Sequence, residues 1–324
     1  MGRHSKSKEN KKKKHTGRKV ILFIILLCIV GGIIFAQKVN ELDGNWVAVI
    51  LGHNKQTLEN LDTFNVLIMG ESTGMSDTLI ACTYNPKTQK ASMLSIPRDT
   101  YVENGNYRYS AYNKINSLYS GGKEPEKTVE AINEITGLDI KYYILVDTEA
   151  LIKLVDLIGG VKFEVPIDMK YDDYSQDLHI NLKKGMQTLT GVQAEQVVRF
   201  RHNNDGSSYP TEYGDQDYGR MKTQRNLIIA VAKQTVQFKN IKEIKNIVNV
   251  MKDDVKTNIS FELMKDYLPY AIDMNMDNIK TAQLPGVSEQ RGGGWFFFHN
   301  ETETVNVVSE LFNTIDIQDE QISE

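Results

Sequence analysis

Hydrophobic and polar positions divide the chain into an uncharged N-terminal run and a long body of short alternating segments. Residues 20–36 carry no charge and form an apolar run of about 17 residues, the short end of the range for a membrane-spanning helix. From residue 64 onward, apolar stretches bounded by Gly, Pro and polar residues alternate with helical patterns. We predict strands at residues 64–69, 78–84, 91–96, 142–146, 161–165, 195–200, 280–284 and 295–298. Helices are predicted at residues 126–136, 148–158, 220–238, 241–255 and 304–312.

This order of elements predicts an α/β fold with a mixed central sheet sandwiched by helices, preceded by a single N-terminal transmembrane helix. We expect a cytoplasmic basic tail over residues 1–19, an anchor over 20–36, a stalk over 37–62 and one extracytoplasmic domain over 63–324. A cleaved signal peptide is the alternative to a retained anchor. The residues after Ala36, Gln-Lys-Val-Asn, lack a small-x-small cleavage pattern, which favours the anchor.

Charge is distributed unevenly and supports this topology. Residues 1–19 hold nine Lys and Arg against one Glu, and basic residues beside an apolar span stay in the cytoplasm. The tail's net charge of +8 leaves −12 for the remainder of a chain whose total is −4. An acidic body argues against nucleic-acid binding, which needs a basic face. Cys28 and Cys82 both lie in apolar stretches and are interpreted as small apolar residues, not as a disulfide or metal pair.

The first candidate site follows the predicted strand 91–96. Pro97 ends that strand, and Arg98 and Asp99 come directly after it. Open α/β sheets place ligand-binding groups at strand ends, although a surface ion pair is the simpler interpretation. Glu71 and Asp77 also fall at predicted strand ends in the same half of the sheet. Oxygen ligands beside a phosphate group would favour a hard cation, Mg²⁺ by default.

A second cluster is basic and lies later in the chain. Arg199 and Arg201 would point to one face of an extended segment. Arg220 is expected at a helix start, where backbone N–H groups favour an anion, and Gln224 follows it by one turn. Arginine forks bind phosphate oxygens bidentately, so these residues suit a pyrophosphate. Salt bridges to nearby acids are the alternative.

Other motifs are weaker. Residues 70–74, Gly-Glu-Ser-Thr-Gly, match the G-x-S-x-G nucleophile elbow of α/β-hydrolases, but the residues that follow are strand-like and not helical. The histidines lack metal-ligand spacing. Three glycines at 292–294 are interpreted as a turn into a buried strand.

The chain resembles the LytR-CpsA-Psr family over residues 64–312. The resemblance rests on Ser76-Asp77-Thr-Leu, Ser95-Ile-Pro-Arg98-Asp99-Thr-Tyr-Val, Lys114-Ile-Asn116, Val155-Asp156-x-x-Gly-Gly-Val161, Val198-Arg199-x-Arg201 and Asp217-Tyr-Gly-Arg220 with Gln224. It implies a phosphotransferase that moves an anionic glycopolymer, of the teichoic acid or capsule type, from an undecaprenyl-pyrophosphate carrier to peptidoglycan, forming a phosphodiester. Membrane attachment is implied as well.

The resemblance also implies roles for individual residues. Arg98, Arg199, Arg201 and Arg220 would hold the pyrophosphate, with Lys114, Asn116 and Gln224 assisting. Asp77 and Glu71 would hold Mg²⁺, and Asp99 would orient Arg98 or act near the metal. An apolar tunnel for the polyprenyl tail is implied, with residues 151–158 and 227–231 as candidate walls, although core packing explains these residues equally well.

Three positions depart from the family pattern. Glu71 and Met75 stand where aspartate and arginine are usual, and Thr223 replaces an arginine, with Arg225 close by. Met75 therefore keeps open a non-catalytic polyprenyl-phosphate-binding protein as an alternative. A membrane-bound transcriptional attenuator is a further alternative, but a 19-residue cytoplasmic tail is too short to fold a DNA-reading domain.

Overall fold

The computed structural model describes residues 28–105, 107–120, 124–235, 246, 249–250 and 253–312. The predicted basic tail, residues 20–27 of the predicted anchor and most of the predicted helix 241–255 lie outside these ranges. Residues 28–41 are helical, and the apolar side chains at positions 28–36 are exposed. Within the described ranges, no helix is both long enough and apolar enough to cross a membrane.

The chain forms two compact units. Unit 1 comprises residues 1–61 and 265–273, and unit 2 comprises residues 62–264 and 274–324. The described part of unit 1 holds the helix 28–41, α2 (Trp46–Ile50), α3 (Lys55–Glu59) and the later part of α9 (Phe261–Asp273). Its buried Asn45 caps α2 by accepting a hydrogen bond from Ala48 N at 2.9 Å and donates to Pro269 O at 2.9 Å. The sequence did not predict that residues 265–273 belong with this segment.

Unit 2 is built on a six-stranded mixed sheet. The strand order is β10 (Lys280–Gln283), β3 (Lys90–Ile96), β2 (Met75–Asn85), β1 (Phe64–Ser72), β4 (Tyr142–Asp147) and β9 (Val255–Thr257). β1 pairs with β4 in parallel and with β2 antiparallel, while β10 pairs with β3 in parallel. The predicted strands 64–69, 78–84, 91–96 and 142–146 all lie in this sheet. Val255, predicted to end a helix, is instead the first residue of β9.

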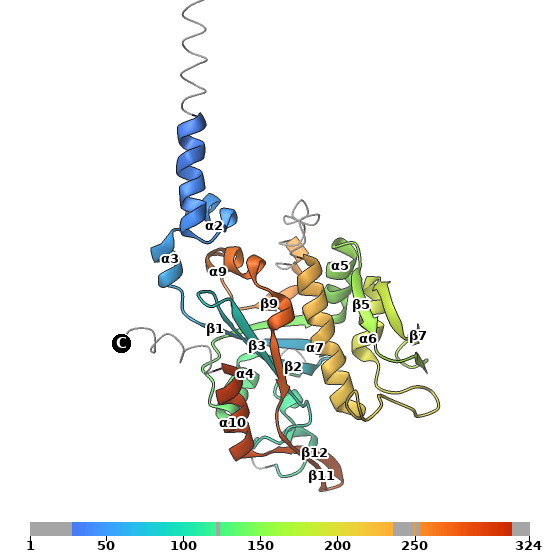
Figure 1. Cartoon of the computed structure of the whole chain (residues 1–324). Coiled ribbons are helices and arrows are strands. Elements are labelled where there is room, and N and C mark those ends of the chain that lie inside the picture. Colours follow the sequence, from blue (N-terminus) through green and yellow to red (C-terminus); the bar gives the residue numbers. More distant parts are fainter. Residues whose placement is uncertain are drawn as a thin grey trace, which may run out of the picture. The chain divides into compact units, whose positions relative to one another are not determined.

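Helices cover both faces of the sheet, as predicted (Figure 1). Alternate residues of β1, including Leu67 and Met69, join one core with α4 (Glu126–Thr136) and α10 (Glu301–Phe312). α5 (Thr148–Leu157) and α7 (Gln216–Thr235) contact the strands from the other side. Gly137 ends α4 in the left-handed conformation, φ 70°, as its position after the helix predicts.

A second hydrophobic cluster packs beside α5 and α7. It includes the antiparallel pair β5 (Val161–Val165) and β8 (Gly185–Leu189), the hairpin β6 (Met169–Asp173) and β7 (Leu178–Leu182), and α6 (Gly191–Arg199). The strand predicted at 195–200 is wrong, because these residues continue α6 up to Arg199. Thr190 and Gln193 form a capping box that begins this helix, and a Cβ at Gly191 would lie 2.3 Å from Ile152 O, so only glycine allows the close packing.

Two hairpin turns settle two sequence interpretations. Residues 70–74 lie in the β1–β2 hairpin, where Thr73 and Gly74 take positive φ and β2 begins at Met75. A nucleophile elbow must be followed by a helix, but here the motif is followed by a strand, which contradicts the hydrolase interpretation. The glycines at 292–294 connect β11 (Gly286–Arg291) to β12 (Gly294–His299), and β12 is largely buried at Phe296 and Phe297, as predicted.

Candidate functional site: an arginine-lined cavity

Unit 2 contains a cavity of about 600 Å³ beside the face of the sheet that α5 and α7 cover. Among the predicted site residues, its lining includes Glu71, Asp77, Arg98, Arg199, Arg201, Arg220 and Gln224. Apolar side chains form much of the remaining wall, including Ile68, Ile144, Leu151, Leu154, Leu227 and Val231. The predicted walls at 151–158 and 227–231 thus contribute in part, because Val155 and Ile158 are buried in the adjacent core instead.

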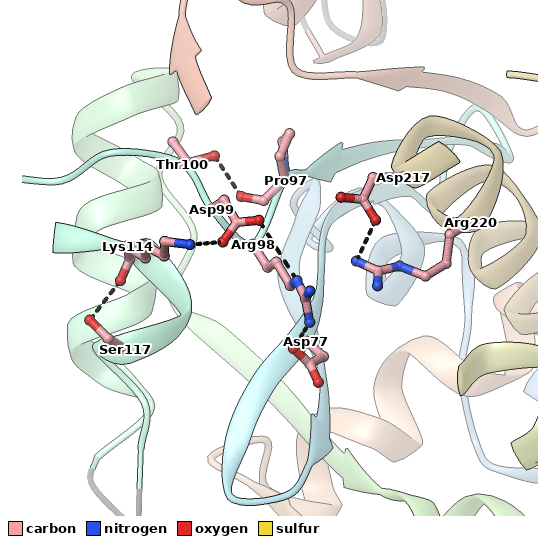
Figure 2. A network of polar contacts seen from close by, with 9 residues as sticks. All are labelled: Asp77, Pro97, Arg98, Asp99, Thr100, Lys114, Ser117, Asp217 and Arg220. Atoms are coloured by element: carbon pink, nitrogen blue, oxygen red, sulfur yellow. Dashed lines mark hydrogen bonds and ion pairs between the residues drawn. The ribbon is translucent and has the colours of Figure 1, made fainter. Parts of the chain in front are cut away.

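Arg98 lies at the centre of an ionic network formed by segments distant in sequence (Figure 2). Its Nη1 donates to Asp77 Oδ1 at 2.6 Å, and its Nε lies 3.9 Å from Asp99 Oδ2. The other Asp99 oxygen accepts a hydrogen bond from Lys114 Nζ at 2.7 Å. Asn116 N donates to Arg98 O at 3.2 Å, so its described contact is with the backbone of the loop. Asp99, Lys114 and Asn116 are not among the cavity-lining residues, and they contact Arg98 or its partner Asp99.

These contacts stabilise the charge of Arg98, whose side chain is only 19% exposed. Burial works to lower the pKa of Arg98. The ion pair and hydrogen bond with Asp77, together with the nearby Asp99 and Asp217, outweigh burial and raise that pKa above its ordinary value.

Arg220 reaches the same region from α7. The sequence predicted Arg220 at the start of this helix. The helix instead begins at Gln216, so Arg220 lies in its second turn. Its Nη2 lies 3.2 Å from Asp217 Oδ1, while its buried Nε has no hydrogen-bond partner among the described residues. Burial lowers the pKa of Arg220; Asp217 opposes this effect, and repulsion from Arg98 and Arg201 adds to it. A buried cation with a vacant donor is suited to an anionic ligand.

Gln224 follows Arg220 by one helical turn, and both side chains are buried and line the cavity, as the spacing predicts. Its Nε2 donates to Val198 O at 3.0 Å, which ties α7 to α6. Its buried Oε1 accepts no hydrogen bond within the described ranges.

Arg199 and Arg201 enter from the end of α6. Arg199 is the last residue of that helix, so the two side chains do not share a face by strand alternation, but both still line the cavity. Arg199 Nη1 donates to Glu195 Oε1 at 2.7 Å, and Nη2 donates to Gln176 Oε1 at 2.8 Å. Sequence reasoning missed both partners. Glu195 stands four residues before Arg199, a helical spacing that the strand prediction concealed.

Glu71 lies near the end of β1, just after a register shift between Gly70 and Glu71. Its Oε2 accepts a hydrogen bond from the buried Tyr119 hydroxyl at 2.7 Å. Burial and this bond raise the pKa of Tyr119 to about 12. The described residues contain no group of three or more His, Cys, Asp and Glu side chains placed to hold a metal ion by themselves.

Sequence comparison assigns the family. A sequence model of the LytR_cpsA_psr family matches residues 5–313. The chain belongs to this family. Polyisoprenyl-teichoic acid--peptidoglycan teichoic acid transferase TagU of Bacillus subtilis (strain 168) is 28% identical over 321 residues, covering 95% of this chain and 99% of TagU.

Solved structures of similar proteins share the fold. The crystal structure of B. subtilis TagV aligns with a TM-score of 0.62 and 27% identity, covering 78% of this chain and 98% of TagV. A structure of TagT bound to LI-WTA aligns with a TM-score of 0.60 and 26% identity, covering 78% of this chain and 90% of TagT. The α/β fold with a mixed central sheet is thus shared by these structures.

The positions that depart from the LytR_cpsA_psr pattern have different surroundings. Met75 lines the cavity and is 39% exposed. Thr223 is fully buried, and its hydroxyl donates to Gly219 O at 2.8 Å. Arg225 does not line the cavity; its Nη1 donates to Ser95 Oγ and Ala282 O, which holds α7 to β3 and β10. Arg225 therefore does not replace the arginine missing at Thr223.

Proposed function

We propose that this protein is a phosphotransferase that moves an anionic glycopolymer from an undecaprenyl-pyrophosphate carrier to peptidoglycan. The observation that carries the proposal is one cavity lined by Arg98, Arg199, Arg201 and Arg220 beside an apolar wall. Such a cavity is chemically matched to a lipid pyrophosphate, which joins an anionic head to a hydrocarbon chain. The names of TagU and TagV, transferases that join teichoic acid to peptidoglycan, support the same reaction class.

The reaction needs positioning and charge stabilisation more than covalent catalysis. An acceptor hydroxyl oxygen attacks the phosphorus on the polymer side, forming a new P–O bond. The bridging P–O bond breaks, polyprenyl monophosphate leaves, and the hydroxyl proton is released. Arg98 and Arg220, which line the cavity, would stabilise charge on the phosphate oxygens. Asp99 would hold Arg98 in position, and Lys114 would hold Asp99.

Mg²⁺ is part of this proposal. Asp77 and Glu71 line the cavity, and Mg²⁺ in phosphoryl-transfer sites is held by one or two carboxylates plus substrate phosphates. The absence of a three-residue cluster from the described residues is compatible with that arrangement. When bound, Mg²⁺ would neutralise charge on the pyrophosphate. Asp77 would use the oxygen that does not pair with Arg98, and Tyr119 would fix the orientation of Glu71.

Attachment to the membrane belongs to the same proposal. A charge-free run over residues 20–36, preceded by basic residues, predicts a single span with residues 1–19 in the cytoplasm and the cavity-bearing unit outside the cell. The substrate's polyprenyl tail lies in the membrane, so an anchored enzyme would be held close to its donor.

A transfer assay tests the function. Full-length protein in detergent micelles is supplied with a polyprenyl-pyrophosphate-linked saccharide, a peptidoglycan oligomer and Mg²⁺, and the product is identified by mass spectrometry. We expect saccharide phosphate joined to the oligomer, and none from Arg98→Ala. Arg291→Ala is the matched control, because Arg291 is exposed and, among the described residues, forms its ion pair with Glu289, two positions away. Donor binding without any product from the native chain would favour the non-catalytic binder that Met75 suggests.

A further inference from the structure

Unit 1 exposes an unusual set of large apolar side chains for its size. In the helix 28–41 and around α2, exposed fractions run from 41% to 63% for Ile29, Val30, Ile33, Ile34, Phe35, Trp46, Ile50 and Leu51. Those at positions 29–35 lie within the predicted anchor. Trp46, Ile50 and Leu51 lie beyond it, so an anchor by itself does not account for them.

The short helix α2 presents its apolar side chains with the large ones outward. Ala48 is fully buried, whereas Trp46 is 46% exposed and Ile50 is 63% exposed. Trp46 and Ile50 are four residues apart and share one face of the helix. In a protein surrounded by water, the larger apolar side chains are normally the buried ones. The face that exposes Trp46 and Ile50 is therefore suited to an apolar partner.

The orientation of α2 is fixed by contacts within unit 1. Asn45, which is 5% exposed, accepts from Ala48 N and donates to Pro269 O, joining the start of α2 to residues 265–273. Rotating Trp46 inward would break this buried hydrogen-bonded pair. The helix also carries no acidic residue in its first turn and no basic residue in its last turn, so no charge within it opposes burial in an apolar layer.

The short distance along the chain between the predicted span and α2 indicates that the apolar partner is the membrane. At 1.5 Å per residue, the helix continues only about 8 Å from Ala36, the end of the predicted span, to residue 41. The interfacial layer of a bilayer is about 5–10 Å deep, so α2 must lie close to it if residues 20–36 span the membrane. Tryptophan is enriched in that layer. We propose that Trp46, Ile50 and Leu51 rest in the lipid headgroup–acyl boundary and seat unit 1 on the membrane surface.

This inference rests on the proposed membrane anchor but does not depend on the transferase reaction. The chain contains two tryptophans, Trp46 and Trp295, so each can be isolated as a fluorescent reporter by replacing the other. Trp295 is 59% exposed in β12 of unit 2, which makes it a matched exposed indole.

The test uses the full chain reconstituted in phosphatidylcholine–phosphatidylglycerol vesicles, with or without lipids brominated near the headgroup end of the acyl chain. In Trp295→Phe, we expect Trp46 to lose about half of its emission to the brominated lipid and to emit at shorter wavelength than in a water-exposed state. In Trp46→Phe, we expect Trp295 to lose far less. The Trp46 loss should persist when the protein is diluted to one chain per vesicle.

Three outcomes would overturn the proposed contact of α2 with the membrane surface. Equal quenching of the two reporters would show no preferential contact of Trp46 with lipid. A Trp46 signal that disappears on dilution would point to a second copy of the chain as the partner. Chain that does not float with the vesicles would refute the anchor and the seat together, whereas loss of transfer activity alone would leave both standing.

Discussion

Replacing Arg220 by methionine should stabilise the ligand-free protein while removing most of its stabilisation by pyrophosphate. The Arg220 side chain is only 5% exposed, its Nε is buried without a partner in the described chain, and Arg98 and Arg201 repel it. Methionine keeps most of the packing volume and removes the unsatisfied donor, a relief of about 1–3 kcal/mol. The lost ion pair with Asp217, which is 46% exposed, is worth about 0–1 kcal/mol.

The net gain is therefore about 0–3 kcal/mol, which raises the Tm by about 2–4 °C for each kcal/mol in a domain of 150–250 residues. The assay is thermal unfolding of the full chain in detergent, with and without inorganic pyrophosphate. At a concentration about 100 times its Kd, pyrophosphate should stabilise the native chain by about 2.7 kcal/mol. Arg220→Met should lose most of this shift, because a buried charge-assisted contact is removed.

Arg225→Met is the matched control. Arg225 is also buried and its Nε also lacks a partner among the described residues, but its Nη1 donates to Ser95 and Ala282, and the residue lies off the cavity. We expect that variant to be less stable than the native chain and to keep the full pyrophosphate shift. An Arg220→Met variant that is less stable than the native chain and still responds fully to pyrophosphate would refute the reasoning.

Two further predictions concern groups beside the cavity and in unit 1. Tyr119→Phe removes the hydrogen bond that orients Glu71, so transfer should require a higher Mg²⁺ concentration for half-maximal rate; an unchanged Mg²⁺ dependence would contradict the positioning role. Burial lowers the pKa of His53, and Asp266 opposes this effect. The contribution of neutral His53 to stability is therefore present above the unfolded-state pKa of about 6.5 and is lost as the pH falls through the lower folded-state pKa. As the pH falls from neutral to mildly acidic, the Tm of the native chain should therefore decline more steeply than the Tm of His53→Gln. Parallel declines of the two Tm values would contradict this role of His53.

The arrangement of the basic residues illustrates what sequence reasoning reaches. From strand-end positions and family motifs, the sequence predicted that Arg98, Arg199, Arg201 and Arg220 belong to one site. All four line one cavity. The reasons given for two of them were inaccurate. Arg199 ends a helix and is not in a strand, and Arg220 lies in the second turn of α7 and not at its start. The capping box at Thr190 is a local signal, present in the sequence, that identifies α6.

Apolar periodicity by itself determined much of the sheet, because strands of alternating or continuous apolar residues have few other ways to bury their side chains. It also located the charge-free run at residues 20–36. Local sequence did not determine which polar groups meet, because those contacts join segments far apart in the chain. Only the tertiary structure placed Tyr119 on Glu71, Lys114 on Asp99, and Arg225 between β3 and β10. Burial and pairing, which decide whether an arginine binds a ligand or braces the fold, are properties of that packing.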